Sequence, residues 1–162
     1  FYKVGLELFA TGGGMNLAQE LKAQGKDVFL DWKLHDIGTT VQRSAAVLAE
    51  TGCDFLTVHA EPQVLKAAVQ GRGRSNLKIL GVTVLTSLTD ADLIEMGFNE
   101  TARSLVERRI HHAIAAGAER ISGGRVEGPG SPGEHIAPTV LAAVTHEMRI
   151  MREEIFDAMH RI

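Results

Sequence analysis

The chain has 162 residues, of which 44% are hydrophobic, and a formal net charge of -3. This hydrophobic content is too high for a disordered chain and is sufficient for one core, so we expect a single soluble globular domain. A chain without basic excess is a poor partner for nucleic acid or an anionic membrane, which favours a small-molecule ligand. The sequence has no apolar run of about 18 residues and no secretion-signal pattern, and a cytoplasmic location is therefore expected.

Cysteine and histidine usage argues against disulfide and metal chemistry. Cys53 is the single cysteine, and we predict that it is a buried small hydrophobic residue rather than a reactive thiol. His111 and His112 are adjacent, so on a helix they point about 100° apart and would chelate one ion poorly. His135 and His146 lie apart from them in the sequence, and we assign no metal site.

Short apolar runs alternate with segments of helical periodicity along the first 90 residues. The runs predicted as strands are residues 2–9, 27–32, 54–59 and 78–85. Apolar residues recur at helical spacing over 41–49 and 64–69, and Gly25 and Gly52 stand where helix C-caps belong. This alternation predicts an α/β fold made of repeated βα units around a parallel sheet.

A further helix is predicted over residues 101–116, where one side is apolar: Leu105, Val106, Ile110, Ala113 and Ile114. Glycine and proline are concentrated beyond it, at 123–133, which indicates a change of organisation. We therefore divide the chain into a barrel-like domain over 1–108 and a Gly/Pro-rich, irregular or helical C-terminal tail over 109–162. A complete eight-unit barrel needs about 250 residues, so the fold expected is a partial (βα)8 TIM-barrel-like sheet of four to five units.

Charged residues interrupt the second predicted strand at its carboxyl end, which is where βα folds build their active sites. Asp31 and Lys33 are two residues apart and should point to the same side, with Asp36 in the following loop. The pattern predicts a cation held between two carboxylates, and the lysine could act as a proton donor. An isolated pattern of this kind is also common in solvated turns.

The preceding strand carries two more charged residues inside an apolar run. Lys3 by itself is compatible with a frayed terminal residue, and Glu7 with a solvated residue at a strand end. Their place beside the second strand favours a functional interpretation for the charged group as a whole, because burying several charges for stability alone is costly.

Four motifs in chain order carry a family resemblance: residues 3–9 (KVGLELF), 29–37 (FLDWKLHDI) followed by TTV at 39–41, 57–60 (TVHA) and 82–87 (VTVLTS). They resemble the successive strand motifs of the orotidine 5'-phosphate decarboxylase family, and the likeness extends to about residue 108. The resemblance implies a βα-barrel homodimer of pyrimidine biosynthesis. Such a lyase converts orotidine monophosphate to uridine monophosphate and carbon dioxide without a cofactor.

The resemblance also implies roles for individual residues. Lys33 corresponds to the lysine that protonates C6 of the pyrimidine, and Asp31 to the carboxylate beside the carboxylate of the substrate. Lys3 corresponds to the lysine that orders the charge array and contacts the ribose. Asp36 corresponds to an aspartate donated across the dimer interface.

Three further positions are implied to bind substrate. Thr40 corresponds to another contact across the dimer, Thr86 lies in the segment that meets the pyrimidine, and Ile37 lies between the two cross-dimer residues. The sequence departs from the family at Gly38, where the family has proline, which is expected to loosen the loop after Asp36. No segment after residue 108 matches the phosphate-binding motifs of the family, and its first strand with a further substrate-binding aspartate has no counterpart here.

The tail resembles a different family. Residues 115–118, 122–124, 137–141, 148–150 and 153–156 (EEIF) are similar to segments of the aldehyde dehydrogenase superfamily, over about 110–156. This resemblance implies that Glu154 would contact a nicotinamide ribose and that Phe156 would lie near the nicotinamide. We identify no dinucleotide-binding βαβ unit, the glycines at 12–14 do not form a GxGxxG motif, and Cys53 lies outside the tail, so we do not expect an intact dehydrogenase.

The leading hypothesis is therefore an orotidine monophosphate decarboxylase with its charge array present. One alternative is a non-catalytic fragment or fusion that keeps only the fold. A second alternative is a fragment that binds a nicotinamide dinucleotide through the tail.

Overall fold

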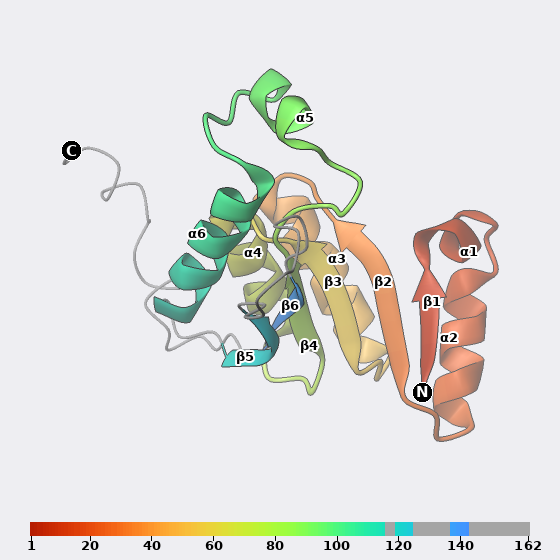
Figure 1. Cartoon of the computed structure of the whole chain (residues 1–162). Coiled ribbons are helices and arrows are strands. Elements are labelled where there is room, and N and C mark those ends of the chain that lie inside the picture. Colours follow the sequence, from red (N-terminus) through yellow and green to blue (C-terminus); the bar gives the residue numbers. More distant parts are fainter. Residues whose placement is uncertain (116–118, 125–136, 143–162) are drawn as a thin grey trace.

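Four parallel strands form the sheet of this protein in the computed structural model, which describes residues 1–115, 119–124 and 137–142. The strands are β1 (Tyr2–Gly5), β2 (Val28–Leu34), β3 (Phe55–His59) and β4 (Lys78–Val82), and they neighbour one another in chain order. Each neighbouring pair is parallel, and their carboxyl ends lie at the edge nearest helix α5 (Asp90–Glu95) (Figure 1). The predicted α/β fold with four βα units is confirmed.

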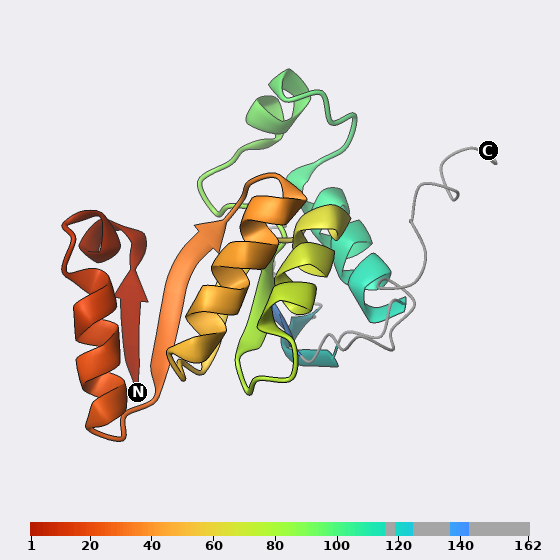
Figure 2. The same ribbon diagram turned by 180° about the vertical axis from the view of Figure 1, so that it is seen from behind.

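Helices connect the strands and cover one face of the sheet. They are α1 (Leu6–Ala10), α2 (Gly14–Ala23), α3 (Gly38–Glu50), α4 (Pro62–Arg72) and α6 (Ala102–Ala115), besides α5. Helices α3 and α4 lie side by side across the sheet (Figure 2), as the predicted periodicities at 41–49 and 64–69 require. They approach so closely at Gly71 that a Cβ atom there would lie 2.1 Å from the carbonyl oxygen of Gln42.

The core lies between this helical layer and the sheet. Alternate strand residues, including Leu30, Leu56 and Val58, are fully buried against the helices. Cys53 is also buried, as predicted, and burial raises the pKa of its thiol. The other face of the strands carries Phe29 and Phe55, whose rings meet edge to face at 6.2 Å, and beyond them the polar residues at the carboxyl ends.

The first strand is shorter than predicted, because the chain turns into helix α1 at Leu6. Residues 6–10 (LELFA) consist mostly of strong helix formers, and so short an apolar run does not distinguish strand from helix. Glu7 is therefore an exposed residue of the first turn of α1 and not a strand residue.

Two other helices were given no range from the sequence, although the cap predicted at Gly25 implied a helix before it. Helix α2 begins at the last of three consecutive glycines, which are weak helix formers, and α5 begins at a capping box in which Thr89 and Asp92 bond reciprocally. Strand β4 ends at Val82, three residues earlier than predicted. Gly25 and Gly52 adopt positive φ angles of 72° and 73° at the ends of α2 and α3, in agreement with the predicted caps.

The last described helix, α6, buries Leu105, Val106, Ile110 and Ala113 as predicted, whereas Ile114 is 40% exposed. Helix α6 crosses position 108 without a break. The division of the chain at 108/109 stays a prediction. Strands β5 (Glu119–Gly124) and β6 (Ala137–Ala142) form an antiparallel pair in the segment predicted as irregular or helical. None of the helices within the described ranges is long and apolar enough to cross a membrane.

Candidate active site

Two ammonium groups meet one carboxylate at the carboxyl end of the sheet. Lys33 Nζ lies 2.7 Å from Asp31 Oδ1, and Lys3 Nζ lies 3.1 Å from Asp31 Oδ2. Lys3 comes from β1 and the other two residues from β2, which pair in register at this level. The predicted arrangement was a lysine between two carboxylates, and it is wrong in this respect. We call the observed group of Lys3, Asp31 and Lys33 the charge array, and its formal charge is positive.

The Asp31 carboxylate is the centre of the charge array. Its side chain is only 14% exposed, and it also accepts a hydrogen bond of 3.0 Å from the hydroxyl of Thr57 on β3. Burial by itself would raise the pKa of Asp31, but the hydrogen bonds from Lys33, Lys3 and Thr57 outweigh it and hold the pKa below its ordinary value. Asp31 is therefore a fixed anion at neutral pH.

The backbone at Lys33 is strained. Lys33 is the single non-glycine residue of the described ranges with a positive φ, at 48°. The β2–β3 ladder is irregular here, since Leu30 pairs with Leu56 whereas Leu34 pairs with Val58. A left-handed conformation costs a non-glycine residue about 1–3 kcal/mol, and such strain concentrates at functional sites. The Lys33 amide is held by a hydrogen bond of 3.0 Å to Thr57 Oγ1.

The other predicted site residues lie around the charge array without joining it. Asp36, Ile37 and Thr40 are exposed on the β2–α3 connection and the first turn of α3. The Asp36 carboxylate accepts a hydrogen bond of 2.7 Å from the Ile37 amide, and within the described residues it makes no contact with Lys33. Thr86 is exposed in the segment that follows β4.

A second polar cluster at the same edge was missed by the sequence interpretation. The rings of His35 and His59 stack with centroids 4.5 Å apart, and each ring has a nitrogen 3.8 Å from Glu61 Oε2. Glu61 Oε1 accepts a hydrogen bond of 2.8 Å from Arg109 of α6, which also donates to the carbonyl of Thr83. The cluster thus ties α6 to the ends of β3 and β4.

The protonation state of this cluster follows from its burial. Desolvation lowers the pKa of His59, with Glu61 opposing the shift and His35 and Arg109 supporting it. His59 is therefore neutral at pH 7. Strand alternation within the 57–60 motif places Thr57 and His59 on one face, and this signal was sufficient to identify them from the sequence.

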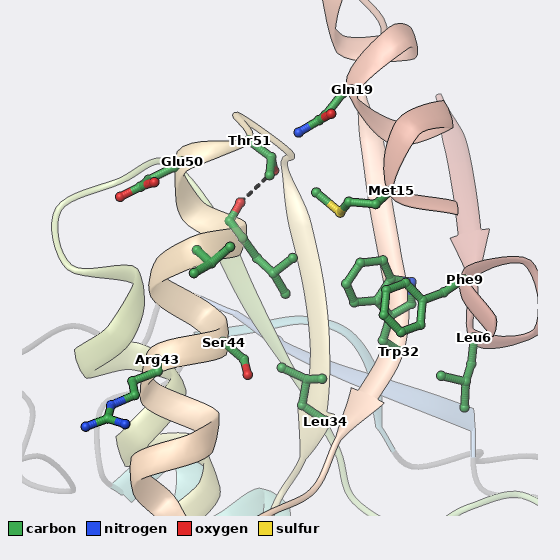
Figure 3. Close-up of a pocket in the computed structure, with 12 residues that line it drawn as sticks. Leu6, Phe9, Met15, Gln19, Trp32, Leu34, Arg43, Ser44, Glu50 and Thr51 are labelled. Carbon is green, nitrogen blue, oxygen red and sulfur yellow. Dashed lines mark hydrogen bonds between the residues drawn. The ribbon is translucent and has the colours of Figure 1, made fainter. Parts of the chain in front are cut away.

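A cavity of about 760 Å³ lies on the other side of β2, between helices α1 and α2 and helix α3 (Figure 3). Trp32 and Phe9 border it with their ring centroids 4.2 Å apart, and Met15 and Leu48 add further apolar surface. Trp32 is buried among core residues, whereas Asp31 and Lys33 before and after it belong to the opposite face. The charge array and this cavity are therefore separate.

A parallel βα sheet with a lysine–carboxylate array at its carboxyl edge defines a partial βα-barrel protein with the layout of an acid–base active site. The chain belongs to the orotidine 5'-phosphate decarboxylase / HUMPS family, whose model matches residues 1–148.

Similar proteins agree with this family. The chain is 69% identical over 121 residues to orotidine 5'-phosphate decarboxylase of Caulobacter vibrioides (strain NA1000 / CB15N). This match covers 75% of this chain and 52% of that protein. Identity to the enzyme of Rhodopseudomonas palustris (strain BisA53) is 55% over 119 residues, with coverages of 74% and 50%. The crystal structure of orotidine 5'-phosphate decarboxylase from Lactobacillus acidophilus is similar with a TM-score of 0.59 and 37% identity, over 67% of this chain and 52% of that one. The chain spans about half the length of the curated relatives it matches.

The second resemblance finds no support in these comparisons. The decarboxylase family model reaches residue 148, so it includes most of the segment likened to the aldehyde dehydrogenase superfamily. Glu154, Phe156, His135 and His146 lie outside the described residues. The expected dinucleotide contacts of Glu154 and Phe156 therefore have no geometry on which a function could rest.

Proposed function

We propose that this chain carries the decarboxylating half of an orotidine 5'-phosphate decarboxylase, which converts orotidine monophosphate to uridine monophosphate and carbon dioxide. The observation that carries the proposal is the charge array, in which Lys33 lies 2.7 Å from a half-buried Asp31 on the sheet of this family. Relatives about twice as long bear the name of this enzyme, and its whole activity is therefore a proposal for this chain.

The chemistry assigned to the charge array needs only side chains of the chain and no cofactor. Cleavage of the bond between C6 and the carboxylate releases carbon dioxide and leaves the electron pair on C6. The ammonium of Lys33 stabilises this developing charge and transfers a proton from Nζ to C6. Asp31, held as an anion by three donors, lies beside the carboxylate of the substrate and disfavours the charged ground state relative to the neutral product.

The remaining predicted residues supply binding. Lys3 is 58% exposed, so its ammonium can contact a ribose hydroxyl while it keeps its bond to Asp31. Thr86, in the segment after β4, offers a hydroxyl to the pyrimidine from the same edge of the sheet. The proposed division at 108/109 leaves all of these groups in the first part of the chain.

We also propose that two copies complete each site. Asp36, Ile37 and Thr40 are exposed, and Ile37 is a large apolar side chain with 70% of its surface accessible. The Asp36 carboxylate makes no contact with the charge array of its own copy within the described residues. With the exposed Ile37 beside it, it is suited to meet the charge array of a second copy. The cytoplasmic location and the absence of nucleic-acid and membrane partners stay predictions.

Mixed dimers test the sharing of residues between copies. Lys33→Ala and Asp36→Ala are each expected to be inactive alone, and their mixture should recover activity, because one site of a mixed dimer has both native residues. Light scattering should give the mass of two chains. A monomeric mass, or a mixture as inactive as its components, would contradict the shared site.

Ultraviolet-monitored consumption of orotidine monophosphate tests the function itself, with Lys33→Ala beside the native chain. We expect the native chain to consume orotidine monophosphate and Lys33→Ala to lose this activity. A folded chain with no turnover and no nucleotide binding would instead favour the alternative of a non-catalytic module.

A further inference from the structure

We propose that Thr57 is the positioning residue of the charge array: its hydroxyl fixes the Asp31 carboxylate and the strained Lys33 backbone at the same time. The inference rests on the proposed function, because it assigns Thr57 a role in the site that carries out the decarboxylation. No substrate contact is assigned to Thr57 itself.

The hydroxyl of Thr57 bridges two residues of the neighbouring strand. A hydroxyl has one proton to donate and two lone pairs to accept. The proton lies toward Asp31 Oδ1 at 3.0 Å, since the carbonyl of Leu30 is more distant at 3.5 Å and carries no charge. A lone pair accepts the Lys33 amide proton at 3.0 Å. One side chain thus holds both the anion and the backbone of the cation.

This bridge lies where the β2–β3 ladder is interrupted. Residues 31–33 fall in the irregular part of the β2–β3 ladder, between the pairs Leu30–Leu56 and Leu34–Val58. The β1–β2 and β2–β3 ladders of the described strands include no pair for Lys33. Here the amide is held by a side chain, which allows Lys33 its φ of 48° without leaving a polar group unpaired.

Thr57 is itself held in place by burial and by strand pairing. It is 6% exposed, and it lies on the inner strand β3, where it pairs with Leu80 of β4. Lys3 and Lys33 are 58% and 38% exposed, so neither lysine can fix the carboxylate through its own packing. The orientation of Asp31, with Oδ1 toward Lys33 and Oδ2 toward Lys3, therefore depends on the Thr57 hydroxyl.

Thr57→Val and Thr57→Ser separate the hydroxyl from the volume of the side chain. Valine keeps the shape and removes the hydroxyl, whereas serine keeps the hydroxyl. In nuclear magnetic resonance at neutral pH, we expect the Asp31 carboxyl carbon to shift in Thr57→Val, and Lys33 amide exchange to accelerate at least about tenfold with loss of its acceptor. Thr57→Ser should resemble the native chain in both signals.

These signals are read without turnover, so they test the inference separately from the proposed function. Unchanged Asp31 and Lys33 signals in Thr57→Val would overturn the inference, whether or not the chain decarboxylates its substrate. If Thr57→Val does not fold, the native chain and Thr57→Ser decide, since rapid exchange of the native Lys33 amide would overturn it equally.

Steady-state kinetics test whether positioning by Thr57 matters for catalysis. We expect the kcat of Thr57→Val to fall by about tenfold or more with KM nearly unchanged, because the hydroxyl orders the reacting groups and does not bind substrate. Thr57→Ser should restore kcat. A change confined to KM, or an equal loss in both variants, would show that Thr57 acts through binding or packing instead.

Discussion

Lys33 Nζ lies 2.7 Å from Oδ1 of Asp31, the residue two positions earlier on the same strand. Because alternate residues of a strand share a face, this pair forms from one short segment of sequence. The groups that complete it come from elsewhere, since Lys3 lies on β1 and Thr57 on β3. The reacting pair is therefore local, and its orientation depends on how the sheet assembles.

Asp54, at the opposite edge of the sheet, should make the stability of the chain depend on pH. Asp54 Oδ2 accepts hydrogen bonds of 2.8 Å each from Lys22 Nζ and the Val28 amide. Burial alone would raise the pKa of Asp54, but these two bonds hold it below its ordinary value. A carboxyl with a lowered pKa in the folded state stabilises the fold above its unfolded value of about 4, and this contribution is lost as the pH falls through the folded value.

Asp54→Asn should therefore lower the free energy of unfolding at pH 7 by about 1 kcal/mol and weaken the loss of stability below pH 4. Asp31 has a lowered pKa as well, so part of the acid dependence should remain. Urea denaturation at pH 7 and pH 3.5 measures both effects, with Asp27→Asn at an exposed site as the control. Identical acid dependence in the native chain and Asp54→Asn would contradict this assignment.

Gly71 should tolerate no side chain. An added Cβ would lie 2.1 Å from the Gln42 carbonyl oxygen and 2.9 Å from the Ala45 Cβ, both in α3, so α3 and α4 would have to separate. Gly71→Ala is expected to destabilise the chain by about 1–3 kcal/mol in thermal or urea unfolding. Gly38→Ala is the matched control, because its Cβ would meet Ala67 at an ordinary 3.8 Å. Equal stability of the two variants would mean that the helices are packed less closely.

Gly38, where the family has proline, is the first residue of α3. The preceding Ile37 has φ -59° and ψ 147°, which suits a residue before proline, and the first amide of a helix has no partner within the helix. Gly38→Pro should therefore stabilise the chain by about 0.4–1 kcal/mol by restricting the unfolded state. A lower melting temperature in Gly38→Pro would show that the connection after Asp36 needs the freedom of glycine.

The parts of this protein that depend on local pattern could be predicted from its sequence. The periodicities of α3 and α4 and the charged break at Asp31 and Lys33 were predicted because each lies in one continuous segment. The contact between Glu61 and Arg109 was not, since it joins residues 48 positions apart.

The wrong predictions have the same origin. Asp36 was placed against Lys33 because they are near in sequence, whereas the loop aims its carboxylate at the Ile37 amide. The strand predicted through Phe9 became α1, since an apolar run of this length fits either structure until packing decides.

Release of labelled carbon dioxide tests the central claim most directly. Orotidine monophosphate with ¹³C in its carboxylate would be incubated with the native chain, with Lys33→Ala, and with Lys26→Ala, in which an exposed lysine before β2 is removed. We predict labelled carbon dioxide from the native chain and Lys26→Ala, and a rate at least about a hundredfold lower from Lys33→Ala. Equal release from all three proteins, or none above the uncatalysed rate from any, would contradict the assignment of decarboxylation to the charge array of this chain.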